Sequence, residues 1–271
     1  MGHATRRHRG GHRQRPVADE YHTARFGCFV KLDAATVMLQ WASGGMLFLW
    51  FTFRSGEISV GYAKLLRGVY ATIALGGAAL GFALDRIIIR EVAALVLVAL
   101  AIVGFARRDT VLDRLATAAG FVGVGVAALS VDNQSDALWL VRLIVGAVFL
   151  GAISDAMLLG HWYLVQPGMP RKLLNQLTNV LLVIWPLEIL VLLIPTGMVS
   201  VLNGTIDDGW GGVLGWFWLA CALLTGVLAW FTRAALRERS YSAVMAATGL
   251  SYLAILMGFG TDLIARALLA V

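Results

Sequence analysis

Asp155 and Glu188 lie well inside long apolar stretches of this chain, and a third ionisable side chain, His161, lies one to two turns after Asp155. A charged group at the centre of a bilayer costs roughly 2.5–3.5 kcal/mol on insertion scales, so such a group needs a partner or a function. Carboxyl and imidazole groups bind and release protons, and helices that carry them line cavities in transporters. The three residues therefore predict a polar site inside the membrane that handles protons, ions or a small polar substrate.

The geometry of a straight helix limits which of these groups can meet. Asp155 and His161 are six residues apart, which places them about 240° apart around one helix, so they do not share a face. A short link at 167–170 makes the Glu188 helix antiparallel to the Asp155 helix. We therefore expect Glu188 to lie near one of these two groups, through a bridging water rather than in direct contact. Pro186, which removes a backbone hydrogen bond, predicts a kink beside Glu188.

Other polar and aromatic residues are candidates to support this site. Asp262 and Arg266 are one turn apart in the last apolar segment and can pair at i, i+4. The full supporting set is Arg142, Trp162, Tyr163, Asn179, Asp262 and Arg266. We identify no catalytic residue and expect no metal site.

His161 has several alternative roles. It could relay protons, ligate haem, or donate a hydrogen bond to a quinone beside Trp162 and Tyr163. Haem held between helices usually has two axial ligands, and the other histidines all lie within the first 22 residues. A structural histidine with a hydrogen-bond acceptor is the bland alternative. The cofactor is therefore undetermined, with haem and quinone as the candidates.

The composition indicates which solvent surrounds these residues. Of the 271 residues 59% are hydrophobic and 14% are charged, and the mean hydropathy is +0.78. A soluble domain is usually about one quarter charged, so lipid must surround many of these side chains. The sequence also lacks the phosphate-binding GxxxxGK[ST] motif, HExxH, and GxSxG with partners, and nothing supports ATP hydrolysis. We predict an all-α, polytopic transmembrane helix bundle.

Apolar runs long enough for a helix to cross the hydrocarbon core occur eight times. Polar residues interrupt the first run, and Arg90 and Glu91 shorten the third, so seven crossings are an alternative to eight. Lys64 and Arg67 are expected at the membrane surface. Small residues, including Gly77 and Gly81, favour close helix packing. The predicted helices lie near 33–53, 65–84, 87–106, 115–131, 138–160, 173–195, 210–231 and 242–265.

The distribution of charge predicts orientation. Basic links near 107–114, 166–172 and 232–240 alternate with acidic links, which by the positive-inside rule places the basic links in the cytoplasm of a cell-membrane protein. Residues 1–32 carry seven Arg or Lys residues and predict a basic, disordered tail before a single transmembrane domain at 33–271. Eight crossings would place this tail outside, against the same rule. The C-terminus lies outside in either case. A net charge of +6 suits anionic lipid, and no nucleic-acid partner is expected.

Three functions fit these observations. The first is transport of protons, ions or a small substrate through a polar interior. The second is a non-catalytic membrane subunit or assembly factor of a larger complex, possibly respiratory, with protein partners. The third is a membrane redox subunit that binds haem or quinone at His161. Whether the chain is an enzyme is not determined by its sequence.

Overall fold

The computed structural model describes residues 32–107, 110–130, 136–166, 169 and 171–269. All of them belong to one compact unit that follows residue 30. The predicted basic tail at 1–32 lies outside the described residues except for Leu32. That part of the prediction therefore stays a prediction.

The described residues form eight helices that are long and apolar enough to cross a membrane. This confirms the predicted all-α polytopic bundle, with ends that fall within a few residues of the predicted ones. A ninth, six-residue helix, α8 (Gly197–Leu202), follows the sixth span. The eight long helices are α2 (Ala34–Phe53), α3 (Val60–Ala83), α4 (Ile88–Ala106), α5 (Thr110–Leu129), α6 (Asp136–Val165), α7 (Lys172–Leu193), α9 (Val213–Ala235) and α10 (Tyr241–Leu269).

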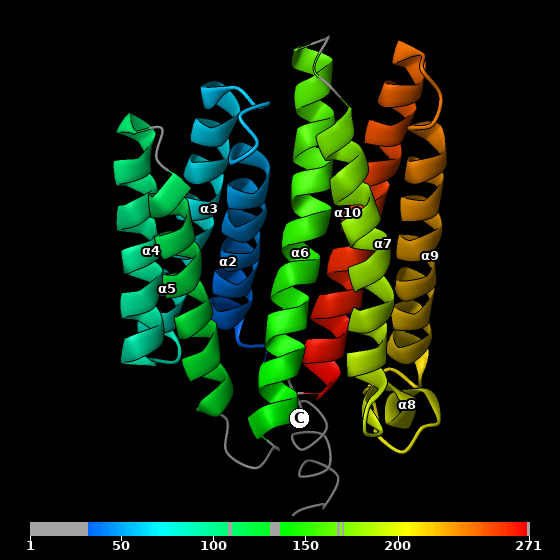
Figure 1. Ribbon diagram of the computed structural model, residues 1–271. Helices are drawn as coiled ribbons and strands as arrows, with labels where there is room; N and C mark the ends of the chain where they lie inside the picture. Colours follow the sequence, from blue (N-terminus) through cyan, green and yellow to red (C-terminus); the bar gives the residue numbers. More distant parts are fainter. Residues whose placement is uncertain (1–31, 108–109, 131–135, 167–168, 170, 270–271) are drawn as a thin grey trace, which may run out of the picture. The chain divides into compact units, whose positions relative to one another are not determined.

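The long helices form two groups of four. In the first group each of α2, α3, α4 and α5 packs on the next, and α5 packs back on α2. In the second group α6, α7, α9 and α10 follow the same order, and α10 packs back on α6. Consecutive helices run in opposite directions, as Figure 1 shows. The links that follow α2, α4, α6 and α9 thus lie at one end, the basic end, and the others lie at the acidic end.

Helices α2 and α6, the first of each group, join the two groups. A Cβ on Gly44 of α2 would overlap the carbonyl of Ala147 in α6, and a Cβ on Gly151 would overlap the backbone of Gly44. Glycine allows two membrane helices to approach this closely, and the dispersion contacts between their backbones stabilise the packing. Helix α6 also packs on α5, α7 and α10, so it lies at the centre of the bundle.

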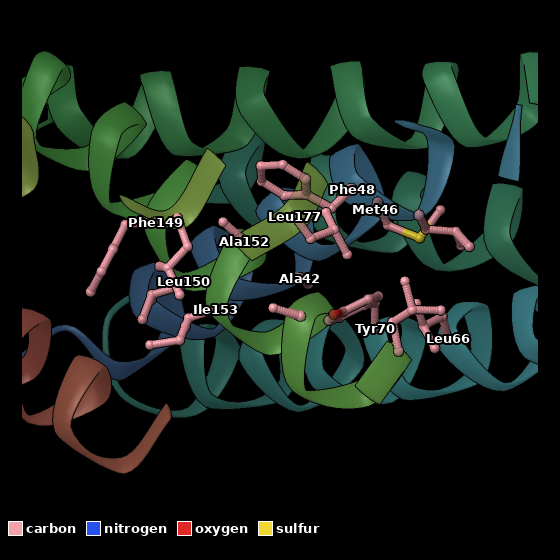
Figure 2. Packing of buried hydrophobic residues seen from close by; sticks show 14 of the residues in the cluster. Ala42, Met46, Phe48, Leu66, Tyr70, Phe149, Leu150, Ala152, Ile153 and Leu177 are labelled. Atoms are coloured by element: carbon pink, nitrogen blue, oxygen red, sulfur yellow. The ribbon is translucent and has the colours of Figure 1, made fainter. Parts of the chain in front are cut away.

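Buried apolar side chains from four helices surround this junction. Figure 2 shows Ala42, Met46 and Phe48 of α2 beside Leu66 and Tyr70 of α3, with residues 149–153 of α6 and Leu177 of α7. All of these side chains are buried. A charged or polar group on the inner faces of α2, α3 or α6 is consequently shielded from both lipid and water.

Arg67, which the sequence places at the membrane surface, is buried within the bundle near its basic end. Its side chain is fully buried, and Nε and Nη2 donate to the two carboxylate oxygens of Asp113 at 2.8 and 2.7 Å. Nη1 donates to the carbonyl oxygen of Gly104 at 2.7 Å. Lys64, by contrast, is exposed. Asp113 of α5, which is distant in sequence, supplies the counter-charge that allows Arg67 to be buried in the bundle.

Candidate functional site

The structure separates the predicted site residues by depth. Glu188, Asp262, Arg266 and Arg142 come together near the acidic end. Asp155 lies elsewhere, about 15 Å below the basic end, because it precedes the end of α6 by ten residues at 1.5 Å each. His161 lies on the outside of the bundle. Each of Glu188, Asp155 and His161 has different polar neighbours, and the proximity of Glu188 to Asp155 or His161 stays a prediction.

Near the acidic end, Arg266 and Asp262 form the i, i+4 pair that the sequence predicts. Nε of Arg266 donates to Oδ2 of Asp262 at 2.7 Å, and Nη2 donates to Oδ1 at 2.8 Å. Asp262 is fully buried and Arg266 is 6% exposed. Both oxygens of this carboxylate thus accept hydrogen bonds from one guanidinium.

Glu188 of α7 lies against this pair but lacks a donor of its own. Its side chain is 1% exposed, and neither carboxyl oxygen has a hydrogen-bond partner among the described residues. Asp262, Arg266 and Arg142 all lie close enough to act electrostatically on it. Glu188 is therefore the carboxyl of this cluster that has charged neighbours but no hydrogen-bond donor among the described residues.

Arg142 connects α6 to the end of α7. Its Nε donates to the carbonyl of Val191 at 3.2 Å, and its Nη2 donates to the carbonyl of Ile194 at 2.5 Å. These are carbonyls that no longer have a partner within the ending helix. Arg142 thus closes the end of α7 while it adds positive charge next to Glu188, and Pro186 inside α7 lies two residues before that carboxyl.

Gln40 of α2 completes what we call the acidic-end cluster, namely Gln40, Arg142, Glu188, Asp262 and Arg266. Its amide is fully buried, and neither Oε1 nor Nε2 has a hydrogen-bond partner among the described residues. Gly146 of α6 makes room for it. A Cβ at that position would overlap the amide and would lie 2.5 Å from Nη2 of Arg266.

A cavity of about 190 Å³ lies between the acidic ends of α2, α5, α6 and α10. Exposed residues, Asp85 and Ser130, line its outer part, and the nearly buried Arg266 also lines it. Asp33, Thr36 and Trp139 belong to the same lining. The cavity thus gives solution at the acidic end a route to the guanidinium that holds Asp262 beside Glu188.

Asp155 forms a separate polar centre with Tyr70 of α3, which we call the Tyr70–Asp155 pair. Both side chains are fully buried, and the Tyr70 hydroxyl donates to Oδ1 of Asp155. The other oxygen, Oδ2, has no partner, and no described Lys, Arg or His forms a salt bridge with this carboxyl. An ionised carboxylate without a cation is costly in an apolar interior. Asp155 is therefore a second buried carboxyl with which no described cation forms a salt bridge.

The remaining predicted residues lie closer to the basic end. His161 is exposed, and its Nδ1 lies 3.1 Å from the hydroxyl of Tyr252. Trp162 packs its ring on Tyr62 at a centroid distance of 5.6 Å, and Tyr163 is 4% exposed. Asn179 is exposed and accepts a hydrogen bond from Nε of Arg233 at 2.6 Å. None of these four residues belongs to the acidic-end cluster.

The sequence did not predict Gln40, Tyr62 and Tyr70 as site residues. Gln40 is one of the polar residues that interrupt the first apolar run, and an amide within a 20-residue helix that lacks charged residues was the available signal. For Tyr70 no local signal existed, because its partner Asp155 is on another helix 85 residues away.

No group of three or more His, Cys, Asp or Glu side chains that could hold a metal ion occurs among the described residues. The two candidate centres consist of carboxyl, guanidinium, amide and phenol groups, which suit proton transfer and the binding of small polar species. A scan against protein-family models, a search of curated proteins and a search of solved structures each found no match for this chain.

Proposed function

We propose that this protein moves protons across a membrane and that Glu188 is the group that loads and releases them near the acidic end. The observation that carries the proposal is the Glu188 carboxyl, which is buried beside Asp262 and has no donor on either oxygen. Retention of such a group without a partner costs stability, in the range of 1–3 kcal/mol for an unsatisfied polar atom. A function in proton binding would explain why a carboxyl occupies this position.

The surroundings of Glu188 suit reversible proton binding. Two arginines favour the ionised carboxylate, whereas burial and the neighbouring Asp262 favour the neutral acid. Because these influences act in opposite directions, a small change near Glu188 can decide whether its carboxyl is protonated. The cavity that reaches Arg266 supplies water from the acidic end. On the positive-inside rule we place that end outside the cell and the basic links in the cytoplasm.

The experiment is proton flux into liposomes that contain the purified protein and a pH-sensitive dye, driven by an imposed potassium diffusion potential. Wild type should carry flux well above that of protein-free liposomes. Glu188→Gln should reduce the flux about tenfold or more, because it retains the shape of the side chain but cannot release a proton. Asp207→Asn, which changes an exposed carboxyl in the link before α9, is the matched control and should leave the flux unchanged.

Two outcomes would contradict the proposal. One is a wild-type flux no greater than that of empty liposomes, and the other is an equal flux in wild type and Glu188→Gln. Folding of each variant is checked by size-exclusion chromatography and thermal unfolding, so that a loss of flux is not a loss of protein.

A second candidate function is suggested by the His161–Tyr252 contact. A histidine and a tyrosine with a 3.1 Å contact between polar atoms lie exposed on helices that cross the membrane. A quinone head group with carbonyl oxygens would accept hydrogen bonds from both. Solvent extraction of the purified protein followed by mass spectrometry tests this, and His161→Ala should abolish any quinone found with wild type.

A further inference from the structure

Three buried oxygen atoms without hydrogen-bond partners lie between the middle of the bundle and its basic end. They are Oδ2 of Asp155, the hydroxyl of Tyr62 and Oε2 of Glu57. Asp155 and Tyr62 are fully buried, and the Glu57 side chain is 30% exposed. Buried polar atoms are rarely left unpaired, and those that are commonly bind water or take part in chemistry.

The three groups form a sequence in depth. Asp155 and Tyr70 lie about 15 Å from the basic end, since Tyr70 follows the start of α3 by ten residues. Tyr62 follows that start by only two residues, and Glu57 lies in the link that precedes α3. Side chains on a helix lean towards its N-terminus, and the N-terminus of α3 is at the basic end. Tyr62 therefore lies between Asp155 and Glu57 in depth.

Electrostatic contacts connect the groups step by step. The Tyr62 phenol interacts with the Asp155 carboxyl and with Tyr163, and Tyr163 interacts with Glu57. Trp162 packs on the Tyr62 ring and holds it in position. No direct hydrogen bond joins Tyr62 to Asp155 in the described part of the chain, so a proton path between them requires bridging water, which costs little relative to a direct bond.

Charged groups that would trap a proton on this path are absent from the neighbouring described segments. Helix α2, which packs on both α3 and α6, contains no Asp, Glu, Lys, Arg or His. The titratable groups that face Asp155 are Tyr70 and Tyr62 from α3. Glu188 of α7, and Asp262 and Arg266 of α10, belong to the acidic-end cluster. Two cations lie at the basic end of the path: Nζ of Lys172 is 4.0 Å from Oε1 of Glu57, and Arg171 acts electrostatically on Tyr163.

We infer that Asp155 exchanges its proton with solution at the basic end through Tyr62 and bridging water, with Glu57 as the outermost acceptor. The inference rests on the proposed function, for which it supplies the second half of the path. In each step one O–H bond breaks and one forms. Asp155 gives its proton to a water, Tyr62 accepts a proton on its oxygen while it releases its own, and Glu57 receives the proton and returns it to solution. Tyr62 is a positioning and relay residue that ends each step unchanged.

The test is infrared spectroscopy of the purified, folded protein during transfer into deuterated water. The C=O stretch of a protonated carboxyl is separate from that of a carboxylate and shifts when deuterium replaces the proton. Asp155→Asn should remove the band and so assign it, and ¹³C-aspartate labelling assigns it if that variant does not fold. In wild type the band should shift quickly, and in Tyr62→Phe about tenfold more slowly, which equals 1.4 kcal/mol in the barrier.

Tyr62→Phe removes one hydroxyl that has no hydrogen-bond partner among the described residues, so we expect this variant to fold. Tyr241→Phe is the matched control, because it removes an exposed tyrosine hydroxyl at the start of α10, and its exchange rate should equal that of wild type. Equal rates in Tyr62→Phe and wild type would overturn the inference. Absence of any protonated aspartate band would also overturn it.

This readout separates the two proposals, because it does not depend on transport. A protein that carries no flux but whose Asp155 exchanges through Tyr62 would refute the proposed function and retain the inference. A protein whose flux depends on Glu188, but whose Asp155 exchanges equally fast without the Tyr62 hydroxyl, would do the reverse.

Discussion

Buried charged side chains have more hydrogen-bond partners in the first four-helix group, α2 to α5, than around α6. In the first group, Arg90 donates five hydrogen bonds, two of them to Glu91 and the others to the Asp33 carboxylate, the Thr36 hydroxyl and the Asp85 carbonyl. Arg67 is likewise paired with both oxygens of Asp113. Around α6, by contrast, one carboxyl oxygen of Asp155 and both carboxyl oxygens of Glu188 have no hydrogen-bond partner among the described residues.

This difference teaches which buried charges hold the fold and which are available for chemistry. A fully paired guanidinium has no capacity left for a ligand or a proton, and each partner depends on the other to offset desolvation. A carboxyl with free oxygens has that capacity, at a cost in stability. The arginine networks of Arg67 and Arg90 are therefore structural, whereas the groups around α6 are candidates for function.

The largest effect should follow from breaking an arginine network. Asp113→Asn leaves the Arg67 guanidinium buried without a counter-charge, which typically costs about 3–5 kcal/mol. Thermal unfolding in detergent should show a large fall in the transition temperature. The double variant Arg67→Met with Asp113→Leu removes both charges and should recover most of the loss; an unchanged transition in the single variant would contradict a structural role.

A smaller effect should follow from filling the space beside the acidic-end cluster. The Cβ of Gly146→Ala would overlap the Gln40 amide and lie 2.7 Å from Oδ1 of Asp262. Overpacking of this kind costs about 1–3 kcal/mol, and proton flux should fall because the carboxyls are displaced. Gly249→Ala is the control, since a Cβ there meets nothing within 4 Å. Equal stability and flux in the two variants would show that the cluster tolerates displacement.

A fully satisfied carboxylate outside the spans should give a pH-dependent effect. Burial raises the pKa of Asp208, but hydrogen bonds from four backbone N–H groups lower it by more, so the pKa lies below its ordinary value. The donors are Gly212, Trp210, Leu214 and Gly215. A depressed pKa means that the contribution to stability is complete above the unfolded pKa of about 3.9 and is lost as pH falls through the folded pKa.

Asp208→Asn should accordingly cost about 1 kcal/mol near neutral pH, a usual value for a group that caps a helix. Transition temperatures of wild type and variant, measured from pH 7 down to pH 2, should converge in acid. Parallel curves over this range would show that the Asp208 charge contributes nothing to the fold.

The smallest effect on stability is expected at Glu188, where the effect on flux is expected to be the largest. Glu188→Gln removes no hydrogen bond that the carboxyl makes with a described donor, and the amide can donate to Asp262. The free energy of unfolding should change by less than about 1 kcal/mol, within the range of ordinary substitutions. A loss as large as that of Asp113→Asn would place Glu188 with the structural charges and remove the contrast between the two regions.

The sequence by itself determined the all-α membrane architecture, the eight long helices and the Asp262–Arg266 pair. Apolar length, mean hydropathy and the i, i+4 spacing are local properties, and a helix expresses them whatever surrounds it. It also pointed to the carboxyls at Asp155 and Glu188, because a charge within an apolar run is costly in any fold.

Only the tertiary structure decided which groups meet. Tyr70 reaches Asp155, Asp113 reaches Arg67, and Gln40 reaches the acidic-end cluster across helices that are distant in the chain. The rotation and height of each helix follow from packing between backbones, such as the contact of Gly44 with Gly151. That packing depends on the shapes of both partners at once, and no periodicity within one segment contains this information.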